Sequence, residues 1–319
     1  MQKQQFYDQN WTHDWVGEWY SIFRSLGEHT DMIFLKCSLA GEIEDAYYMD
    51  HGANDGAGAL KILTEKAQTP AMSYDLNKAV RPNFFKQLLG FLRYFLDTRV
   101  HSINWKTRHH EMAGKKMQPL VHVMSVEQTK NLLAKARTEG VSLTMYILKY
   151  VDSGVREFLQ NEQKENIWLV PVDMRASFKR KNPLSNHYSY VAVRPSANMS
   201  LAALNRQFKT SLAIGYHFAA WWGLLVGRII GLKGMQKITA KYHKKKHSWT
   251  GVLSNMGRWG HPGSKHVWAV TSPVTRTHPV GVVFMTWNGQ FSISMQVHPS
   301  VDPDGSLSQR LLDFLRKNL

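Results

Sequence analysis

The stretch His51-Gly52-Ala53-Asn54-Asp55-Gly56 ends an apolar run and opens into Ala57-Gly58-Ala59-Leu60-Lys61-Ile62-Leu63. This pattern predicts a strand, a tight turn and a helix, with an imidazole at the exit of the strand. The spacing His-x-x-x-Asp-Gly lets Asp55 turn back from the helix start and fix the loop, while Gly56 tolerates backbone geometry that a Cβ atom would forbid. A histidine fixed in this way suits a general base.

Length, composition and charge limit the class of protein. The chain has 319 residues, 43% of them hydrophobic and 12% aromatic, so it can bury a sizeable core and is not disordered. Its formal net charge of +16 predicts a negatively charged partner, which could be nucleic acid, an anionic membrane, or a phosphate-bearing or acidic molecule. Cys37 is the one cysteine, which excludes an internal disulfide and favours a buried small apolar side chain in a reducing compartment.

Three segments bear on targeting and on membranes. Residues 1–10 are polar and lack the apolar core of a signal peptide, so the cytoplasm is the expected compartment. Residues 210–227 carry no charged side chain, yet their polar and small residues favour a buried or interfacial helix over a membrane span. Residues 84–96 are also apolar and helical, with Lys86 and Arg93 as cations, and they suggest peripheral contact with an anionic membrane.

The apolar periodicity stops over residues 105–119, which divide the chain. We interpret these residues as a linker between an N-terminal lobe, residues 1–104, and a C-terminal lobe, residues 120–319. In the second lobe we expect strands at residues 120–124, 167–172, 187–193, 280–286 and 291–297. Helices are expected from the capping box at Ser125, over residues 143–159 and over residues 306–319.

The last two of these strands form the strongest hairpin signal in the chain. Asn288-Gly289 between them suits a type I′ turn. Large apolar residues alternate with Ser and Gln over residues 290–297, so we expect one face of this strand to be buried and the other to be polar.

The order of these features resembles the chloramphenicol acetyltransferase-like superfamily, which includes condensation domains and wax ester synthase/diacylglycerol acyltransferases. The resemblance is carried by collinear segments that span most of the chain from Met32 to Leu319. They are His51 to Gly56, the run from Ser125 through Val141-Ser142-Leu143-Thr144, Val170-Pro171-Val172-Asp173-Met174-Arg175 with Asn186 following, and Leu253-Ser254-Asn255-Met256-Gly257.

The resemblance implies an α/β (α+β) fold, a two-lobed sandwich with mixed sheets and a substrate tunnel between the lobes. The tunnel would admit a thioester donor from one face and a nucleophilic acceptor from the other. The implied catalytic residues are His51, Asp55 and Gly56, with His51 as the base. Two departures are visible: Asp50 stands where the family has a first histidine, and the first lobe looks short. The effect of Asp50 on the imidazole pKa depends on the direction of its carboxylate.

The chemistry follows from the residue types. A neutral imidazole takes the proton of an acceptor hydroxyl or amine as it attacks a thioester carbonyl, then returns it to the departing thiolate. By resemblance, Asp55 pairs with an arginine, for which Arg175 is the candidate. Asn255 or Ser254 would donate a hydrogen bond to the oxyanion, although the same residues also suit a turn after a strand.

The resemblance implies no bound cofactor and no metal; coenzyme A or a phosphopantetheine thioester would serve as co-substrate. The expected partners are acyl-coenzyme A or an acidic acyl carrier protein. His109, His110, His243, His247, His261 and His266 lack the spacing of a zinc site. The basic run over residues 241–247 reads as a solvated loop, with lipid head groups, coenzyme A phosphates or a carrier protein as functional alternatives.

Three functions remain open from the sequence. The first is an acyltransferase that uses His51. The second is a catalytically inactive, condensation-like protein that binds acyl chains or a partner, suggested by Asp50 and by the short first lobe. The third is nucleic-acid binding, which rests on charge alone, so no specific nucleic-acid partner is expected. Trp259 and Trp287 are expected in the core rather than along the tunnel.

Overall fold

The computed structural model describes residues 15–68, 72–73, 83–97, 103–107, 119–162, 165–175, 184–244 and 249–319. The first part of the chain contains α1 (Trp15–Ser25), β1 (Asp31–Ser38), β2 (Ile43–Asp50), α2 (Gly56–Lys66), β3 (Met72–Ser73) and α3 (Phe84–Asp97). The middle part contains β4 (Leu120–Val123), α4 (Val126–Thr138), α5 (Leu143–Phe158), β5 (Trp168–Asp173), β6 (Tyr188–Val193) and α6 (Leu201–Ala213). The last part contains α7 (Tyr216–Leu225), α8 (Gly227–Lys244), β7 (Gly251–Gly260), β8 (His266–Thr271), β9 (Val280–Trp287), β10 (Gln290–Val297) and α9 (Ser306–Asn318).

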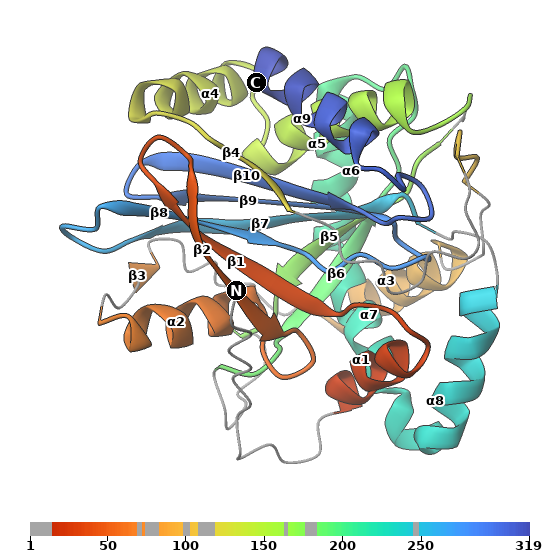
Figure 1. The fold of residues 1–319 in the computed structure, drawn as a ribbon. Coiled ribbons are helices and arrows are strands. Elements are labelled where there is room, and N and C mark those ends of the chain that lie inside the picture. Colours follow the sequence, from red (N-terminus) through yellow and green to blue (C-terminus); the bar gives the residue numbers. More distant parts are fainter. Residues whose placement is uncertain are drawn as a thin grey trace.

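The strands form two sheets, and each sheet combines strands from distant parts of the chain (Figure 1). The larger sheet has the strand order β4-β10-β9-β7-β5-β6, with β3 paired to β7. Its β5–β7 and β7–β9 pairs are parallel and the rest are antiparallel. The smaller sheet has the order β2-β1-β8, so a strand from late in the chain completes the sheet that carries the histidine loop. The expected α/β class with mixed sheets is confirmed.

The predicted local elements are present at the expected places. β2 leads through the histidine loop into α2, and the Asp55 side chain caps this helix by accepting from the Gly58 amide at 2.9 Å. Ser125 and Gln128 form the reciprocal capping box of α4. The β9–β10 hairpin turns at Asn288 and Gly289, which both have positive φ, as a type I′ turn requires.

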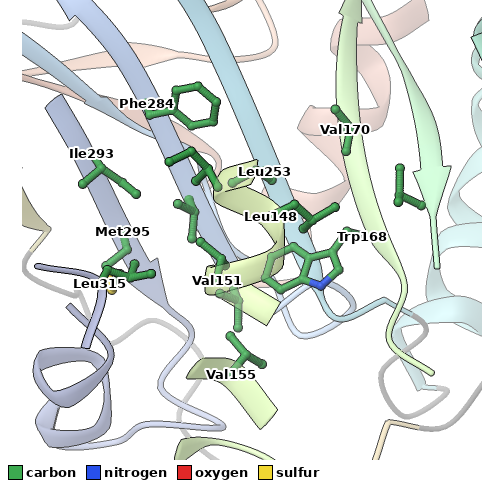
Figure 2. Close-up of a cluster of buried hydrophobic side chains, with 14 of the residues drawn as sticks. Leu148, Val151, Val155, Trp168, Val170, Leu253, Phe284, Ile293, Met295 and Leu315 are labelled. Atoms are coloured by element: carbon green, nitrogen blue, oxygen red, sulfur yellow. The ribbon is translucent and has the colours of Figure 1, made fainter. Parts of the chain in front are cut away.

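The main core lies where α5 and α9 cover one face of the larger sheet. Figure 2 shows Leu148, Val151 and Val155 of α5 directed toward the strands. Their spacing places them on one face of α5, so the helix buries that face. The strands contribute Trp168, Val170, Leu253, Phe284, Ile293 and Met295, and α9 contributes Leu315.

β10 has the predicted polar face, but this face is buried as well. Ser292 and Ser294 are as buried as the apolar residues that alternate with them. The reason is that β8 lies against this face: Ser292 Oγ donates to the Trp268 carbonyl at 2.9 Å, and Ser294 Oγ donates to the Val270 carbonyl. The small hydroxyl side chains therefore permit a second layer to approach and also satisfy its backbone.

Residues 210–227 do not form a single helix. α6 ends at Ala213, Gly215 adopts a left-handed conformation with φ 73°, and α7 begins at Tyr216. Glycine suits this position because a Cβ atom disfavours positive φ. In the middle of α7, the side chains of Phe218 and Trp221 are buried in a small apolar cluster, whereas that of Trp222 is half exposed. The prediction of a buried helix therefore holds for α7.

Two further expectations about loops are wrong. Residues 254–257 lie within β7 rather than in a turn after a strand, and they form a bulge at which Gly257 takes φ 78°. The basic run that begins at Lys241 is not a loop throughout, because α8 continues to Lys244. The rest of that run, residues 245–247, lies outside the described residues.

The first residues of the expected linker pack into the core. Trp105 is buried beside the main core, and the Lys106 amide donates to the Leu159 carbonyl at the end of α5. Residues 108–118 lie outside the described residues, so the two lobe boundaries stay predictions.

Cys37 is fully buried in β1, as expected, and burial raises the pKa of its thiol to about 11. The thiol is therefore unreactive at neutral pH.

Among the helices of the described ranges, none combines the length and the apolar character that crossing a membrane would need.

A substitution at Gly58 would test how closely α2 approaches the backbone at Leu184. A Cβ atom on Gly58 would lie 2.1 Å from the Leu184 carbonyl oxygen, so the helix can approach this segment only through glycine. We expect Gly58→Ala to lower the free energy of unfolding by about 1–3 kcal/mol through overpacking, although alanine favours a helix by about 1 kcal/mol. Urea unfolding measures this difference. A more stable variant would contradict the close approach.

Candidate functional site

A cavity of about 370 Å³ opens beside the histidine loop. Most of the side chains that line it are apolar, and they come from α1, β5, β6, α8 and β7 and from the residues after β8. Polar side chains also line it, among them His51, Ser254, Thr271 and His278. Polar groups at defined places in a mainly apolar cavity are typical of a site that orients a ligand for chemistry.

His51 stands at the wall of this cavity immediately after β2. Its Nδ1 lies 3.1 Å from the Asn54 carbonyl oxygen. Because a carbonyl only accepts, this hydrogen bond places the proton on Nδ1 and leaves Nε2 as the basic nitrogen. The Tyr20 ring packs on the imidazole with its centroid 4.9 Å away. The ring is therefore held in one tautomer and one orientation.

The backbone of the histidine loop is fixed by the segment before β6. The Asn186 amide donates to the His51 carbonyl at 2.9 Å, and the Asn54 amide donates to the Leu184 carbonyl at 2.8 Å. The Tyr20 hydroxyl is hydrogen-bonded to the Asn186 side chain. Asn186 thus contacts both the loop and the ring that packs on His51.

Burial lowers the pKa of His51 below its ordinary value of 6.5. The Asn54 carbonyl and the carboxylates of Asp55 and Asp50 act in the opposite direction, but more weakly. The imidazole is therefore neutral at pH 7. A neutral imidazole with Nε2 unprotonated can accept a proton from a substrate.

Asp55 is fully buried and makes the most contacts in the site. Arg175 Nη2 donates to both Asp55 oxygens at 2.7 Å, so the predicted ion pair is present. The His187 amide donates to Asp55 at 2.8 Å, and the Gly58 amide donates to it as the helix cap. Asp55 therefore holds the loop, the helix and two distant segments together, rather than facing the cavity.

The direction of the Asp50 carboxylate is now defined. Arg24 Nη1 donates to Asp50 Oδ1 at 2.6 Å, and the Gly52 amide donates to the same oxygen at 2.8 Å. The carboxylate is thus neutralised by a guanidinium and bound to its own loop. Its influence on the His51 pKa is correspondingly the smallest of the contributions that raise it.

Of the remaining predicted site residues, two line the cavity and one does not. Gly56 and Ser254 line the cavity, and a Cβ atom on Gly56 would lie 2.6 Å from the Met256 sulfur. Asn255 does not line it: its amide donates to Thr144 at 3.0 Å, and its Oδ1 accepts from the Gly257 amide at 2.8 Å. Of the two candidate oxyanion donors, Ser254 is therefore the one at the cavity.

His278 is a cavity residue that the sequence did not indicate. Its Nδ1 lies 3.1 Å from the hydroxyls of both Thr275 and Thr277. Burial lowers its pKa to about 4, so it is neutral at pH 7 and can donate or accept a hydrogen bond. It lies in an irregular segment before β9, where no periodicity or motif marks it.

Two other expectations concern aromatic and metal-binding residues. Trp259 and Trp287 are buried in an apolar cluster and do not line the cavity, as expected. Within the described ranges, no group of three or more His, Cys, Asp or Glu side chains is arranged to hold a metal ion. His109, His110 and His247 lie outside those ranges.

Removing the Asp55 carboxylate tests its role in joining these segments. We expect Asp55→Ala to lower the free energy of unfolding by about 3–5 kcal/mol, because it removes the fully buried partner of Arg175 and the acceptor of the Gly58 and His187 amides, and leaves Arg175 only its half-exposed partner Asp173. The matched control is Asp50→Ala, whose arginine partner is more exposed and which should cost about 1 kcal/mol or less. Chemical denaturation measures both. Equal losses in the two variants would contradict the assignment.

Histidine titration tests the electrostatics of the loop. We expect the His51 pKa, followed by NMR of the ring protons, to lie below 6.5, and that of His278 to lie near 4. In Asp50→Asn the His51 pKa should fall further, because a carboxylate that favours imidazolium is lost and Arg24 is left unpaired. A rise in that variant would contradict the placement of Asp50.

The comparisons with known proteins concern structure alone. No protein-family model matches the sequence, and no curated protein is significantly similar to it. Among solved structures, the cyclization-docking bidomain of a nonribosomal peptide synthetase from Sorangium cellulosum has a TM-score of 0.54 at 10% identity, over 85% of this chain and 59% of that chain. A four-domain nonribosomal peptide synthetase bound to AMP and glycine has a TM-score of 0.52 at 12% identity, over 85% of this chain and 23% of that chain.

A third similar structure is the epimerization domain from the third module of tyrocidine synthetase B. Its TM-score is 0.50 at 14% identity, over 85% of this chain and 66% of that chain. The chain thus spans about two thirds or less of the length of these solved chains. At such identities the likeness concerns the fold. The chain has the α/β fold of these nonribosomal peptide synthetase domains, and this is the fold class that the resemblance of its sequence predicts.

Proposed function

We propose that this protein transfers an acyl group from a thioester donor to a hydroxyl or amine acceptor. The observation that carries this proposal is the state of His51. It is neutral, its proton is held on Nδ1 by the Asn54 carbonyl, and it stands at the wall of an apolar cavity. These are the properties of a general base that works on an apolar substrate.

The reaction balances with His51 as the only base. His51 Nε2 takes the proton from the acceptor while the acceptor oxygen or nitrogen attacks the thioester carbonyl. The tetrahedral intermediate then collapses, the carbon–sulfur bond breaks, and the imidazolium returns the proton to the leaving thiolate. Because the same proton leaves and returns, no second base and no metal ion enters this sequence of steps.

The other residues of the site support these steps in different ways. Ser254 lines the cavity and is the proposed donor to the oxyanion of the intermediate. Asp55 and Arg175 act as positioning residues, because their ion pair fixes the loop without facing the cavity. His278 lies on the same cavity and is placed to hydrogen-bond a polar group of the acceptor or donor.

The donor would carry its acyl group on coenzyme A or on the phosphopantetheine of an acyl carrier protein. Both are anionic, and the chain has a formal net charge of +16, so its electrostatic field favours either one. The apolar lining favours an apolar acyl group over a short polar one.

Thiol release tests the proposed reaction. Purified protein would be incubated with acyl-coenzyme A donors of increasing chain length, or with the matching acyl carrier protein, in the presence of alcohols and amines. We expect acceptor-dependent thiol release that falls about 10²–10⁴-fold in His51→Ala. The matched control is His122→Gln, a histidine on β4 that does not line the cavity and that should leave the rate unchanged.

The outcome separates the two functions that the sequence leaves open. Equal rates in the wild-type protein and in His51→Ala, with either donor type, would contradict histidine catalysis. If acyl donors then bound without turnover, as measured by calorimetry, the non-catalytic acyl-binding function would replace the transferase. Equal turnover of acetyl and long-chain donors would contradict the preference for an apolar acyl group.

A further inference from the structure

α3 presents its apolar side chains to solvent instead of burying them. Six of its large apolar residues are more than half exposed: Phe84, Phe85, Leu89, Leu92, Phe95 and Leu96. The exposed fraction reaches 74% at Phe84 and 76% at Phe85. A surface helix of a globular protein normally turns its apolar face toward the core and its polar face toward water. α3 is therefore inverted, and so large an exposed apolar face marks an interaction site.

The contacts on the inner side of α3 fix this orientation. Gly90 is buried, and a Cβ atom there would lie 2.5 Å from the Ile214 carbonyl oxygen, so the helix sits directly on the junction of α6 and α7. Asp97 is also buried and pairs with Arg194 at 2.9 Å. The Tyr94 ring packs edge-on against Tyr216 at 5.7 Å. Rotation of α3 to bury its apolar face would break all three contacts.

The charges that α3 and α8 expose are positive. α3 carries Lys86 and Arg93, and its only carboxylate is the buried Asp97. Residues 174–301, which include α7 and α8, contain no Asp or Glu at all. α8 lies on the same side of the molecule as α3 in Figure 1 and adds exposed cations at Lys233 and Lys237. An apolar face that exposes a cation and no carboxylate of its own is complementary to an apolar layer under an anionic one.

We propose that α3 is an interfacial helix that docks this protein onto the surface of an anionic lipid bilayer. Phenylalanine and leucine side chains would enter the boundary between head groups and acyl chains, while the exposed Lys86 extends to the phosphates; Arg93 is held by its ion pair with Asp97 at 3.1 Å. Trp222 of the adjacent α7 is half exposed and suits the same boundary. The proposal is independent of the transferase function.

The docked face lies close to the cavity. Tyr94 of α3 packs against the Tyr190 ring at 6.4 Å, and Tyr190 itself lines the cavity. Ile238 of α8 also lines the cavity. Docking through α3 would therefore bring the cavity within one layer of side chains of the lipid.

Vesicle sedimentation tests the proposal without any assay of acyl transfer. The full chain would be mixed with vesicles of phosphatidylcholine alone or of phosphatidylcholine with phosphatidylglycerol. We expect binding that is stronger to the anionic vesicles and that weakens at least about tenfold in the triple variant Phe84→Gln/Phe85→Gln/Leu92→Gln. The control is Leu39→Gln/Ile43→Gln, which removes exposed apolar side chains at the β1–β2 turn and should bind like the wild type.

A second variant separates charge from apolar contact. We expect Lys86→Gln to weaken binding to the anionic vesicles about fivefold and to leave binding to neutral vesicles unchanged. Absence of vesicle binding would overturn the proposal. Loss of a dimer in the triple variant, seen by light scattering without vesicle binding, would assign the face to a second copy of the chain. Equal binding by the triple variant and the control would show that α3 is not the docking element.

Discussion

The buried carboxylate of Asp55 connects parts of the chain that lie far apart in the sequence. It caps α2, accepts the Arg175 guanidinium from the end of β5 and accepts the His187 amide at the start of β6. A buried charge is tolerated only when its hydrogen-bonding capacity is satisfied, and here every contact comes from a different structural element. The position of the histidine loop therefore depends on the correct assembly of both sheets.

The same arrangement explains how an apolar cavity can hold a useful base. Burial disfavours the imidazolium, and the Asn54 carbonyl fixes the proton on Nδ1. The acidic neighbours do not undo this effect, because Asp55 is paired with Arg175 and Asp50 is paired with Arg24. Both carboxylates thus serve the geometry of the loop, while the apolar lining determines the protonation state of its histidine.

Much of this architecture was predictable from local patterns. The strand, turn and helix around His51, the capping box at Ser125 and the hairpin at Asn288-Gly289 each depend on residues close in sequence, and each is present. The Asp55–Arg175 pair was reached through a family resemblance rather than through local chemistry. Periodicity alone could not have placed these two residues together.

The missed features depend on which distant segment covers which face. The polar side of β10 follows a pattern that is typical of a solvated strand, but β8 covers it. His278 lies in an irregular segment, and only the packing of that segment beside the cavity gives it a role. The apolar character of α3 was evident, but its inverted orientation results from Gly90 and Asp97, whose partners lie far away in the chain.

The pairing of β1 with β8 has a consequence for biosynthesis. Ile33 is aligned with Thr271, so this edge of β1 has no partner in its sheet until a further 238 residues have left the ribosome. At common translation rates of about 5–20 residues per second, this interval lasts on the order of 10–50 seconds. During that time the β1–β2 hairpin presents an open and largely apolar edge, which is a template for wrong pairing. Chaperones that shield nascent chains would therefore matter more for this protein than for one whose sheets close in the order of synthesis.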